Sequence, residues 1–150
     1  VRNSFSKSMT IAVWSDASLS TPKSVSGIFA AILDPEDPNT FYPLYFSSKT
    51  MQLATSSSTA AEYIAAGIAP EVAALLLEAC RELGIMDRDD VVPIVYVDSQ
   101  PVLQGIKRGW APYEPLYGSL TKAAKLRLCT MAQLDASGVV SFKYVRSSQI

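Results

Sequence analysis

The sequence predicts an α/β domain in which helices flank a mixed five-stranded sheet. Three observations predict it. The first 50 residues contain three apolar runs joined by short polar or Pro-containing links, which is typical of an antiparallel meander. Apolar residues then recur at helical spacing over more than 20 positions. Beyond that, strand-like and helix-like segments alternate, as they do where helices connect parallel strands.

The first three strands are expected from Thr10 to near Asp16, at Val25–Leu33 and at Phe41–Ser47. The last two are separated by DPEDPN, whose prolines and Asn are strong turn formers. Residues 1–9 are polar and non-periodic, and we interpret them as a linker or tail. The remainder, residues 10–150, is expected to form a single domain with its own core.

A long helix is expected to begin at Ser58 or Thr59, either of which can cap it, and to end at Gly84. Its apolar residues are spaced to lie on one face. Pro70 lies inside this segment and should kink or split the helix, because proline lacks an N–H and its ring clashes with the preceding turn.

The fourth strand, Val91–Val97, is almost wholly apolar, as expected of a strand that is covered on both faces. Pro93 restricts its early part to a strand start or a sheet edge. A short helix follows, with Ser99 as its cap and Pro101 in its first turn. The remaining elements are an aromatic, Pro-rich loop, a helix at Leu120–Ser137 that Gly138 ends, and a last strand at Val139–Val145.

Composition narrows the possible chemistry. The chain has 150 residues with a net charge of −1, so nucleic-acid binding would need a local basic patch. It contains no apolar run of the roughly 20 residues that a membrane span needs. It has no histidine and only two cysteines, which excludes histidine-based triads, histidine-ligated zinc and four-thiolate zinc sites. Cys80 and Cys129 are expected to be small core residues. Catalysis would therefore depend on carboxylates and a hard cation.

Three acidic residues fall where the predicted fold can bring them together. Asp16 ends the first strand, Asp98 ends the fourth, and Glu62 lies in the first turns of the long helix. If the two strands are parallel neighbours, the two Asp residues emerge side by side and the helix can bring Glu62 across from them. Clustered carboxylates repel one another unless cations neutralise them, and oxygen ligands suit Mg²⁺ or Mn²⁺. Each residue also has a simpler interpretation, as a turn residue, a helix cap or a partner of the helix dipole.

Six short motifs occur in a fixed order around these residues. They are WSDAS at Trp14–Ser18, KSVSG at Lys23–Gly27, FSSK at Phe46–Lys49, SSSTAAEY at Ser56–Tyr63, VYVDSQ at Val95–Gln100 and LTKAAKLRL at Leu120–Leu128. In this order the chain resembles the ribonuclease H domain of copia-type (Pseudoviridae) LTR retrotransposon Pol polyproteins. The order Asp, Glu, Asp separates it from integrases and transposases, which share the sheet type but carry Asp, Asp, Glu.

The resemblance implies a ribonuclease H-like fold in which Asp16, Glu62 and Asp98 bind two Mg²⁺ or Mn²⁺ ions and are catalytic. It implies hydrolysis of the RNA strand of RNA–DNA hybrids during reverse transcription, beside an adjoining reverse transcriptase and away from membranes. The implied location is a cytoplasmic virus-like particle, with the nucleus as the other option. The alternative is an inactive ribonuclease H-like spacer or interaction module in a polyprotein or in a host protein derived from one. A plain α/β binding domain without a nucleic-acid role is a third option.

The sequence departs from the family pattern at three places. Ala60 replaces a Glu that does not bind metal in the family, and Ser99 replaces an Asn but can still cap the helix. The family also has a fourth metal-binding Asp after the last strand, whereas the printed sequence stops at Ile150, before that position. Asp135 precedes the last strand and cannot replace it. We therefore expect either a continuing native chain that carries the C-terminal helix or a weakened metal site.

The resemblance also suggests where a hybrid would bind. Polar residues near the site could recognise 2′-hydroxyls, although helix capping explains them equally well: Ser15, Ser58, Thr59 and Ser99. Basic residues could meet phosphates: Lys49, Lys107, Arg108, Lys122 and Lys125. In the loop before the last helix, Trp110, Tyr113 and Tyr117 could contact sugars or bases, or simply cover the core.

Overall fold

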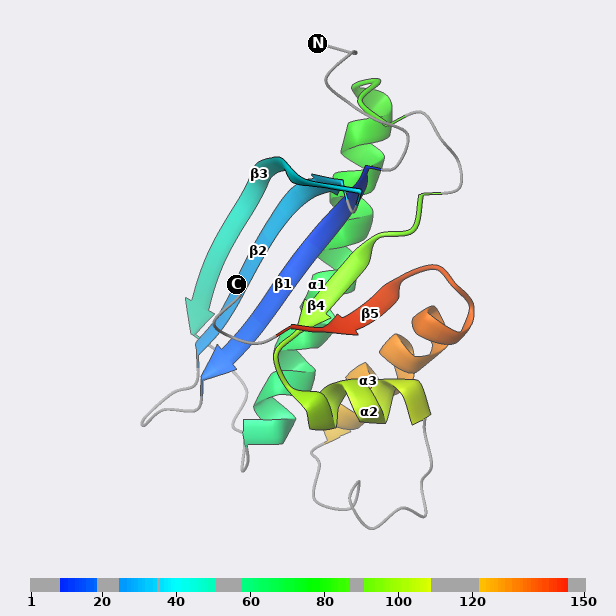
Figure 1. Cartoon of the computed structure of the whole chain (residues 1–150). Coiled ribbons are helices and arrows are strands. Elements are labelled where there is room, and N and C mark those ends of the chain that lie inside the picture. The colour runs from blue at the N-terminus through cyan, green and yellow to red at the C-terminus, as the bar shows by residue number, and fades with distance from the viewer. Residues whose placement is uncertain are drawn as a thin grey trace.

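The computed structural model describes residues 9–18, 25–34, 36–50, 58–86, 91–108 and 122–145 (Figure 1). Within these ranges the chain forms five strands and three helices in the predicted order. They are β1 (Thr10–Ser18), β2 (Val25–Asp34), β3 (Asp37–Thr50), α1 (Ser58–Glu82), β4 (Ile94–Val97), α2 (Gln100–Arg108), α3 (Lys122–Ala136) and β5 (Ser141–Tyr144). The expected tail, residues 1–9, lies outside the described residues except for Met9.

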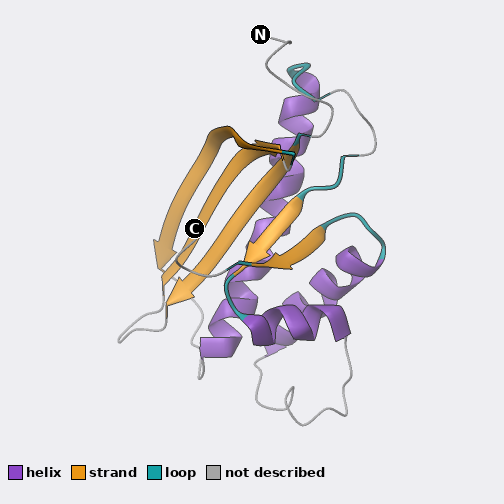
Figure 2. Ribbon diagram, viewed as in Figure 1, coloured by secondary structure: helices purple, strands orange, loops and turns teal. Residues whose placement is uncertain are grey.

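The strands form one mixed sheet in the order β3-β2-β1-β4-β5. β1 pairs with β2, and β2 with β3, in antiparallel orientation, whereas the β1–β4 and β4–β5 pairs are parallel. The predicted meander followed by parallel strands is therefore confirmed. Figure 2 shows the helices beside and behind the sheet, with α1 running across its far face.

β3 is longer than predicted at both ends, because it runs from Asp37 to Thr50 rather than from Phe41 to Ser47, and β1 continues past Asp16 to Ser18. Part of the expected DPEDPN turn therefore belongs to the strand. The turn is tightened by Asp34, whose Oδ1 accepts a hydrogen bond from the Glu36 N–H at 3.0 Å. β3 pairs only with β2 in the sheet, so Pro43 can be accommodated at an edge with a register shift in the pairing beside it.

α1 is one helix from Ser58 to Glu82, with Pro70 inside it. The prediction that Pro70 could split the segment is wrong. The physical reason is tertiary packing: Pro70 is buried, and Ala66, Ala69 and Ala73 on the same helix are at most 2% exposed in the core. Burial on both sides of Pro70 offsets the hydrogen bond that proline cannot make. The helix ends as predicted before Gly84, which has a φ of +77°.

The core lies between α1 and the sheet. Ile11 and Val13 of β1 and Ile28 and Ile32 of β2 are buried in it. Cys80 is buried in the same cluster, as predicted, while Cys129 is half-buried. No helix among the residues that the structure describes has the length and apolar character needed to cross a membrane.

Candidate functional site

β1 and β4, which are neighbours inside the sheet, bring the positions of Asp16 and Asp98 together where the two strands end. In their parallel pairing Ser15 is the register partner of Val97, and each Asp is the next residue of its chain. Neighbouring strands lie about 4.8 Å apart, so the two backbones are adjacent at this end of the sheet. The predicted neighbourhood of Asp16 and Asp98 is therefore present in the backbone. The Asp98 side chain is half-buried, whereas the side chain of Asp16 lies outside what the structure describes.

α1 begins at this same end of the sheet (Figure 1). Its later part lies at the opposite end, because Leu77 and Pro93, the residue before β4, line one cavity. From Leu77 back to Glu62 the helix spans about 22 Å. From Pro93 to Asp98 the strand spans about 16 Å. Glu62 is therefore placed at the level of Asp98 or one turn beyond it, although its side chain is outside the described part.

The possible metal ligands at this end of the sheet fit a hard divalent cation. Three carboxylate residues on β1, on α1 and directly after β4 offer only oxygen, which Mg²⁺ and Mn²⁺ prefer. Among the side chains that are described, no group of three Asp, Glu or Cys forms a metal site, and those of Asp16 and Glu62 are not in that set. The positions of the backbone therefore support the predicted ligand set, and the coordination itself stays a prediction.

A stacked aromatic pair precedes the two Asp positions. Trp14 and Tyr96 are register partners, and their ring centroids lie 5.2 Å apart with an interplanar angle of 15°. Phe29 packs against Trp14 from β2 at 5.6 Å. Burial raises the pKa of Tyr96 by desolvation. Sequence reasoning missed this pair, although its signal is visible: each Asp follows an aromatic residue by two positions, in WSD and in YVD.

Ser99 caps α2 directly after Asp98. Its Oγ accepts a hydrogen bond from the Val102 N–H at 3.4 Å, and its carbonyl oxygen accepts one from the Leu103 N–H at 3.1 Å. The predicted cap is confirmed. Asp98 thus precedes a helix N-terminus, where the helix dipole favours a negative charge. The hydroxyl of Ser99 is engaged with the backbone, so capping is its observed role.

Of the other polar residues predicted to contact a hybrid, the structure describes the side chain of one, Ser15. Ser15 is 4% exposed, so little of the residue is open to contact with a hybrid. It lies on the same face of β1 as Ile11 and Val13, both in the core, as the alternation of a strand requires. Ser58 and Thr59 begin α1 at this end of the sheet, but their side chains lie outside the part of the chain that the structure describes.

The basic candidates do not form one described patch. The Nζ of Lys107 donates to Oδ1 of Asp135 at 2.8 Å, so this lysine is already paired. Arg108 is exposed at the end of α2, and Lys125 is half-buried on α3. Lys49 on β3 and Lys122 on α3 have side chains outside the described part of the chain. Trp110, Tyr113 and Tyr117 lie in residues 109–121, which also fall outside it.

Neither a protein-family model nor a curated protein sequence matches this chain. Its structure is nevertheless similar to solved structures. One is RNase H1 of the halophilic archaeon Halobacterium salinarum, at a TM-score of 0.52 and 14% identity over 93% of this chain and 88% of that one. A second is LC11-RNase H1 in complex with an RNA/DNA hybrid, at a TM-score of 0.55 and 18% identity over 93% of this chain and 88% of that one. A third is the protease–reverse transcriptase of prototype foamy virus, at a TM-score of 0.54 and 13% identity. That match covers 95% of this chain and 18% of the foamy virus chain.

These likenesses agree with the element order and the sheet. The chain's five strands, in the order β3-β2-β1-β4-β5 and with helices around them, align with the two RNase H1 structures over 93% of its length. TM-scores of 0.52–0.55 establish a shared fold, and at identities of 13–18% they show the fold alone. The chain therefore has the ribonuclease H-like fold.

Proposed function

We propose that this chain is a metal-dependent ribonuclease H that hydrolyses the RNA strand of RNA–DNA hybrids. The observation that supports the proposal is the parallel register of β1 and β4, in which the residues directly before Asp16 and Asp98 are partners. The ribonuclease H-like fold and the similarity to an RNase H1 solved with an RNA/DNA hybrid support it.

Asp16, Glu62 and Asp98 would hold two Mg²⁺ or Mn²⁺ ions. When bound, such ions activate a water molecule and stabilise the leaving oxygen of a phosphodiester. The protein's part is positioning. The pairing of β1 with β4 would hold Asp16 and Asp98 near each other, and the capped start of α2 orients the chain after Asp98. The core contacts of α1 would set where Glu62 lies along the sheet.

We further propose that the chain belongs to the polyprotein of a copia-type retrotransposon and works beside a reverse transcriptase. The order of the six sequence motifs and the similarity to the foamy virus protease–reverse transcriptase support this. The proposed location is a cytoplasmic virus-like particle, with the nucleus as the second location.

An inactive ribonuclease H-like module is the second candidate, and it is favoured by the hydrogen bonds of Asp135, the acidic residue before β5. Its Oδ1 accepts hydrogen bonds from Lys107 Nζ at 2.8 Å and from the Phe142 N–H at 3.4 Å. Asp135 therefore has a structural role at the start of β5, and it does not supply a fourth metal ligand.

Cleavage of a labelled RNA strand in an RNA–DNA hybrid separates the two candidates. The assay uses Mg²⁺ or Mn²⁺ with the printed chain and with a chain that carries the next encoded residues. Asp98→Asn should lower the cleavage rate by more than about 100-fold. Loss of a residue that only supports a metal ligand already lowers activity by about 10–100-fold, and loss of the ligand itself should lower it further. Glu78→Gln, an exposed change on α1, is the matched control and should leave the rate unchanged.

Two results would decide against the nuclease. If Asp98→Asn cleaves as fast as the native chain, Asp98 does not bind the catalytic metal. If neither length of chain cleaves the hybrid with either metal, the inactive module is the better description.

A further inference from the structure

β3 forms one edge of the sheet, on the side away from α2 and α3 (Figure 1). Among the strands that the structure describes, β3 pairs only with β2, so the backbone groups along its outer side have no strand partner there. An unpaired edge of this kind is a template for a further strand. Sheets often protect such an edge with charged residues, yet residues 40–48 of β3, TFYPLYFSS, carry no charge.

Four aromatic side chains are exposed along this edge. Phe46 is 73% exposed. Three others are 39–42% exposed: Phe41, Tyr42 and Tyr45. An aromatic side chain can bury about 150–250 Å², so these exposures amount to about 400 Å² on one strand. The largest apolar patch on a monomeric protein measures about 300–600 Å² and is often functional. The edge therefore offers a partner both backbone hydrogen-bonding groups and apolar area.

The sequence of this edge is self-complementary. FYPLYF, at Phe41–Phe46, reads the same in both directions except at its two central residues. In an antiparallel pairing of two copies about the centre of this segment, Phe41 would face Phe46 of the second copy. In the same register Tyr42 would face Tyr45 of the second copy. Aromatic residues that lie directly opposite each other are among the favourable cross-strand pairs.

The register shift between β2 and β3 makes the two halves of this segment compatible. Leu44 is the extra residue, because its neighbours Pro43 and Tyr45 pair with consecutive residues of β2. As a result, the two tyrosines pair with β2 residues two positions apart, and the two phenylalanines with β2 residues four positions apart. Residues at such spacings share a face of a strand, so each facing pair would lie on one face of the joined sheet. Without the extra residue, each pair would join opposite faces.

We propose that β3 pairs with β3 of a second copy of this chain, in antiparallel orientation, and joins the two sheets into one. The charges at the ends of the strand favour this orientation. Asp37 and Lys49 lie at opposite ends of β3, so antiparallel pairing brings unlike charges near each other, whereas parallel pairing would align like charges. Pro43 has no N–H and lies at the centre, so the aromatic pairs on either side keep their backbone donors.

The size of the surface sets the expected affinity. About 400 Å² of aromatic surface from each copy, together with the strand backbone, is near the low end of specific interfaces. We therefore expect a reversible dimer with a Kd of about 1–100 μM. The test is sedimentation equilibrium of the native chain from about 1 to 500 μM, in which the average mass should rise from that of a monomer toward twice that value.

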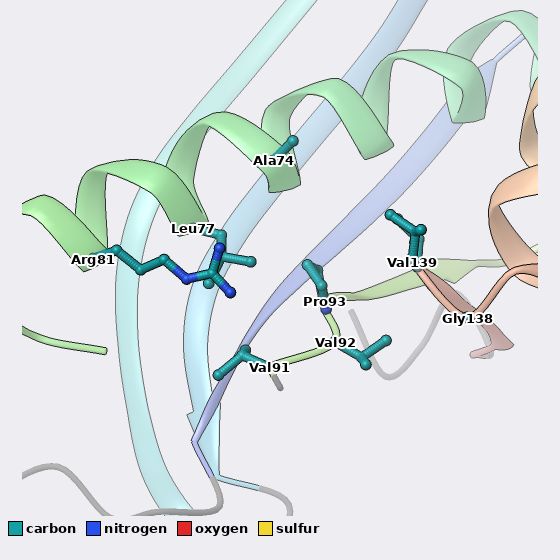
Figure 3. Close-up of a pocket in the computed structure, with 9 residues that line it drawn as sticks. Ala74, Leu77, Arg81, Val91, Val92, Pro93, Gly138 and Val139 are labelled. Atoms are coloured by element: carbon teal, nitrogen blue, oxygen red, sulfur yellow. The ribbon is translucent and has the colours of Figure 1, made fainter. Parts of the chain in front are cut away.

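Three variants test the register. Tyr42→Lys and Tyr45→Glu should each weaken association by at least about tenfold, because each sets an unpaired charge against the facing ring. An equimolar mixture of the two should associate more tightly than either alone, since the introduced charges then face each other. Val92→Glu is the matched control and should leave association unchanged. Val92 is 41% exposed, like the two tyrosines, but it lines the cavity before β4 (Figure 3). Circular dichroism of each variant checks that the sheet is retained.

Dimerisation that both tyrosine variants weaken and their mixture restores would support the proposal. A monomer at every concentration would leave the edge to a strand of another protein and would overturn it. So would a dimer that folded Tyr45→Glu forms as tightly as the native chain, or a mixture no tighter than its separate variants. The interface contains none of Asp16, Glu62 and Asp98, so each of these failures would leave the proposed nuclease standing.

Discussion

Replacing Gly67 with alanine tests the contact by which α1 packs against α3. A Cβ added at Gly67 would collide with Cδ of Arg127 and lie 2.9 Å from its Cγ and 3.0 Å from its Cβ. The Arg127 side chain could swing away, but its Cβ is fixed by the backbone of α3. Moving it would also break the hydrogen bonds from Nη1 of Arg127 to the Gly67 carbonyl oxygen and to Glu71, both at 3.3 Å.

Two opposing terms set the size of the effect. Alanine is favoured over glycine inside a helix by about 1 kcal/mol. Overpacking a close contact costs about 1–3 kcal/mol. The ion pair with Glu71 is exposed and adds at most a few tenths of a kcal/mol. We therefore expect Gly67→Ala to lower the free energy of unfolding by about 1 kcal/mol in the native background.

The loss should shrink when Arg127 is shortened. In Arg127→Ala the Cδ and Cγ atoms are gone and the Cβ contact at 3.0 Å remains, so the effect of Gly67→Ala on the free energy of unfolding should fall to within about 0.5 kcal/mol of zero. Urea unfolding followed by circular dichroism of the two single variants and the double variant measures this coupling. If Gly67→Ala changes stability equally in both backgrounds, the contact between α1 and α3 is not as described.

Three further outcomes are expected. Asp135→Ala should lower the free energy of unfolding by about 1–2 kcal/mol in urea, because it frees Lys107 and an N–H at the start of β5. Lys107→Ala should lower the free energy of unfolding by less than Asp135→Ala does. Burial raises the pKa of the Cys80 thiol, so alkylation followed by mass spectrometry should modify Cys80 more slowly than the half-buried Cys129. Burial also raises the pKa of Tyr96 above its ordinary value of about 10, so its contribution to stability is complete below that pH and is lost as pH rises through the folded-state pKa. Tyr96→Phe should therefore reduce the alkaline fall of the urea midpoint.

The order of the elements along the chain and the antiparallel meander were predictable because each is set by local chemistry. The alternating and helical spacings of apolar residues define the strands and helices. Gly84 and Gly138, both with a φ of +77°, end α1 and α3 where the sequence indicates. The cap at Ser99 is formed within four residues of sequence, so a local pattern was sufficient to find it.

Features that depend on tertiary packing were not predictable. Pro70 is a helix breaker by local rules, and only its burial against the core explains the continuous α1. The pairing of Lys107 with Asp135 joins residues 28 positions apart, so no local pattern around Lys107 indicates its partner. The burial of Ser15 is a different case, since strict alternation from Ile11 and Val13 places it on the core face.

The aromatic pair and the two acidic positions obey one geometric rule. Trp14 and Asp16 are two residues apart on β1, as are Tyr96 and Asp98 across the end of β4, and strand positions two apart share a face. The stack of Trp14 on Tyr96 holds the two strands at one level. A slip of one residue would break that stack and move one Asp position away from the other. Packing of the sheet and placement of the candidate metal ligands are therefore set by the same register, so a change that disturbs the stack should act on metal binding as well as on stability.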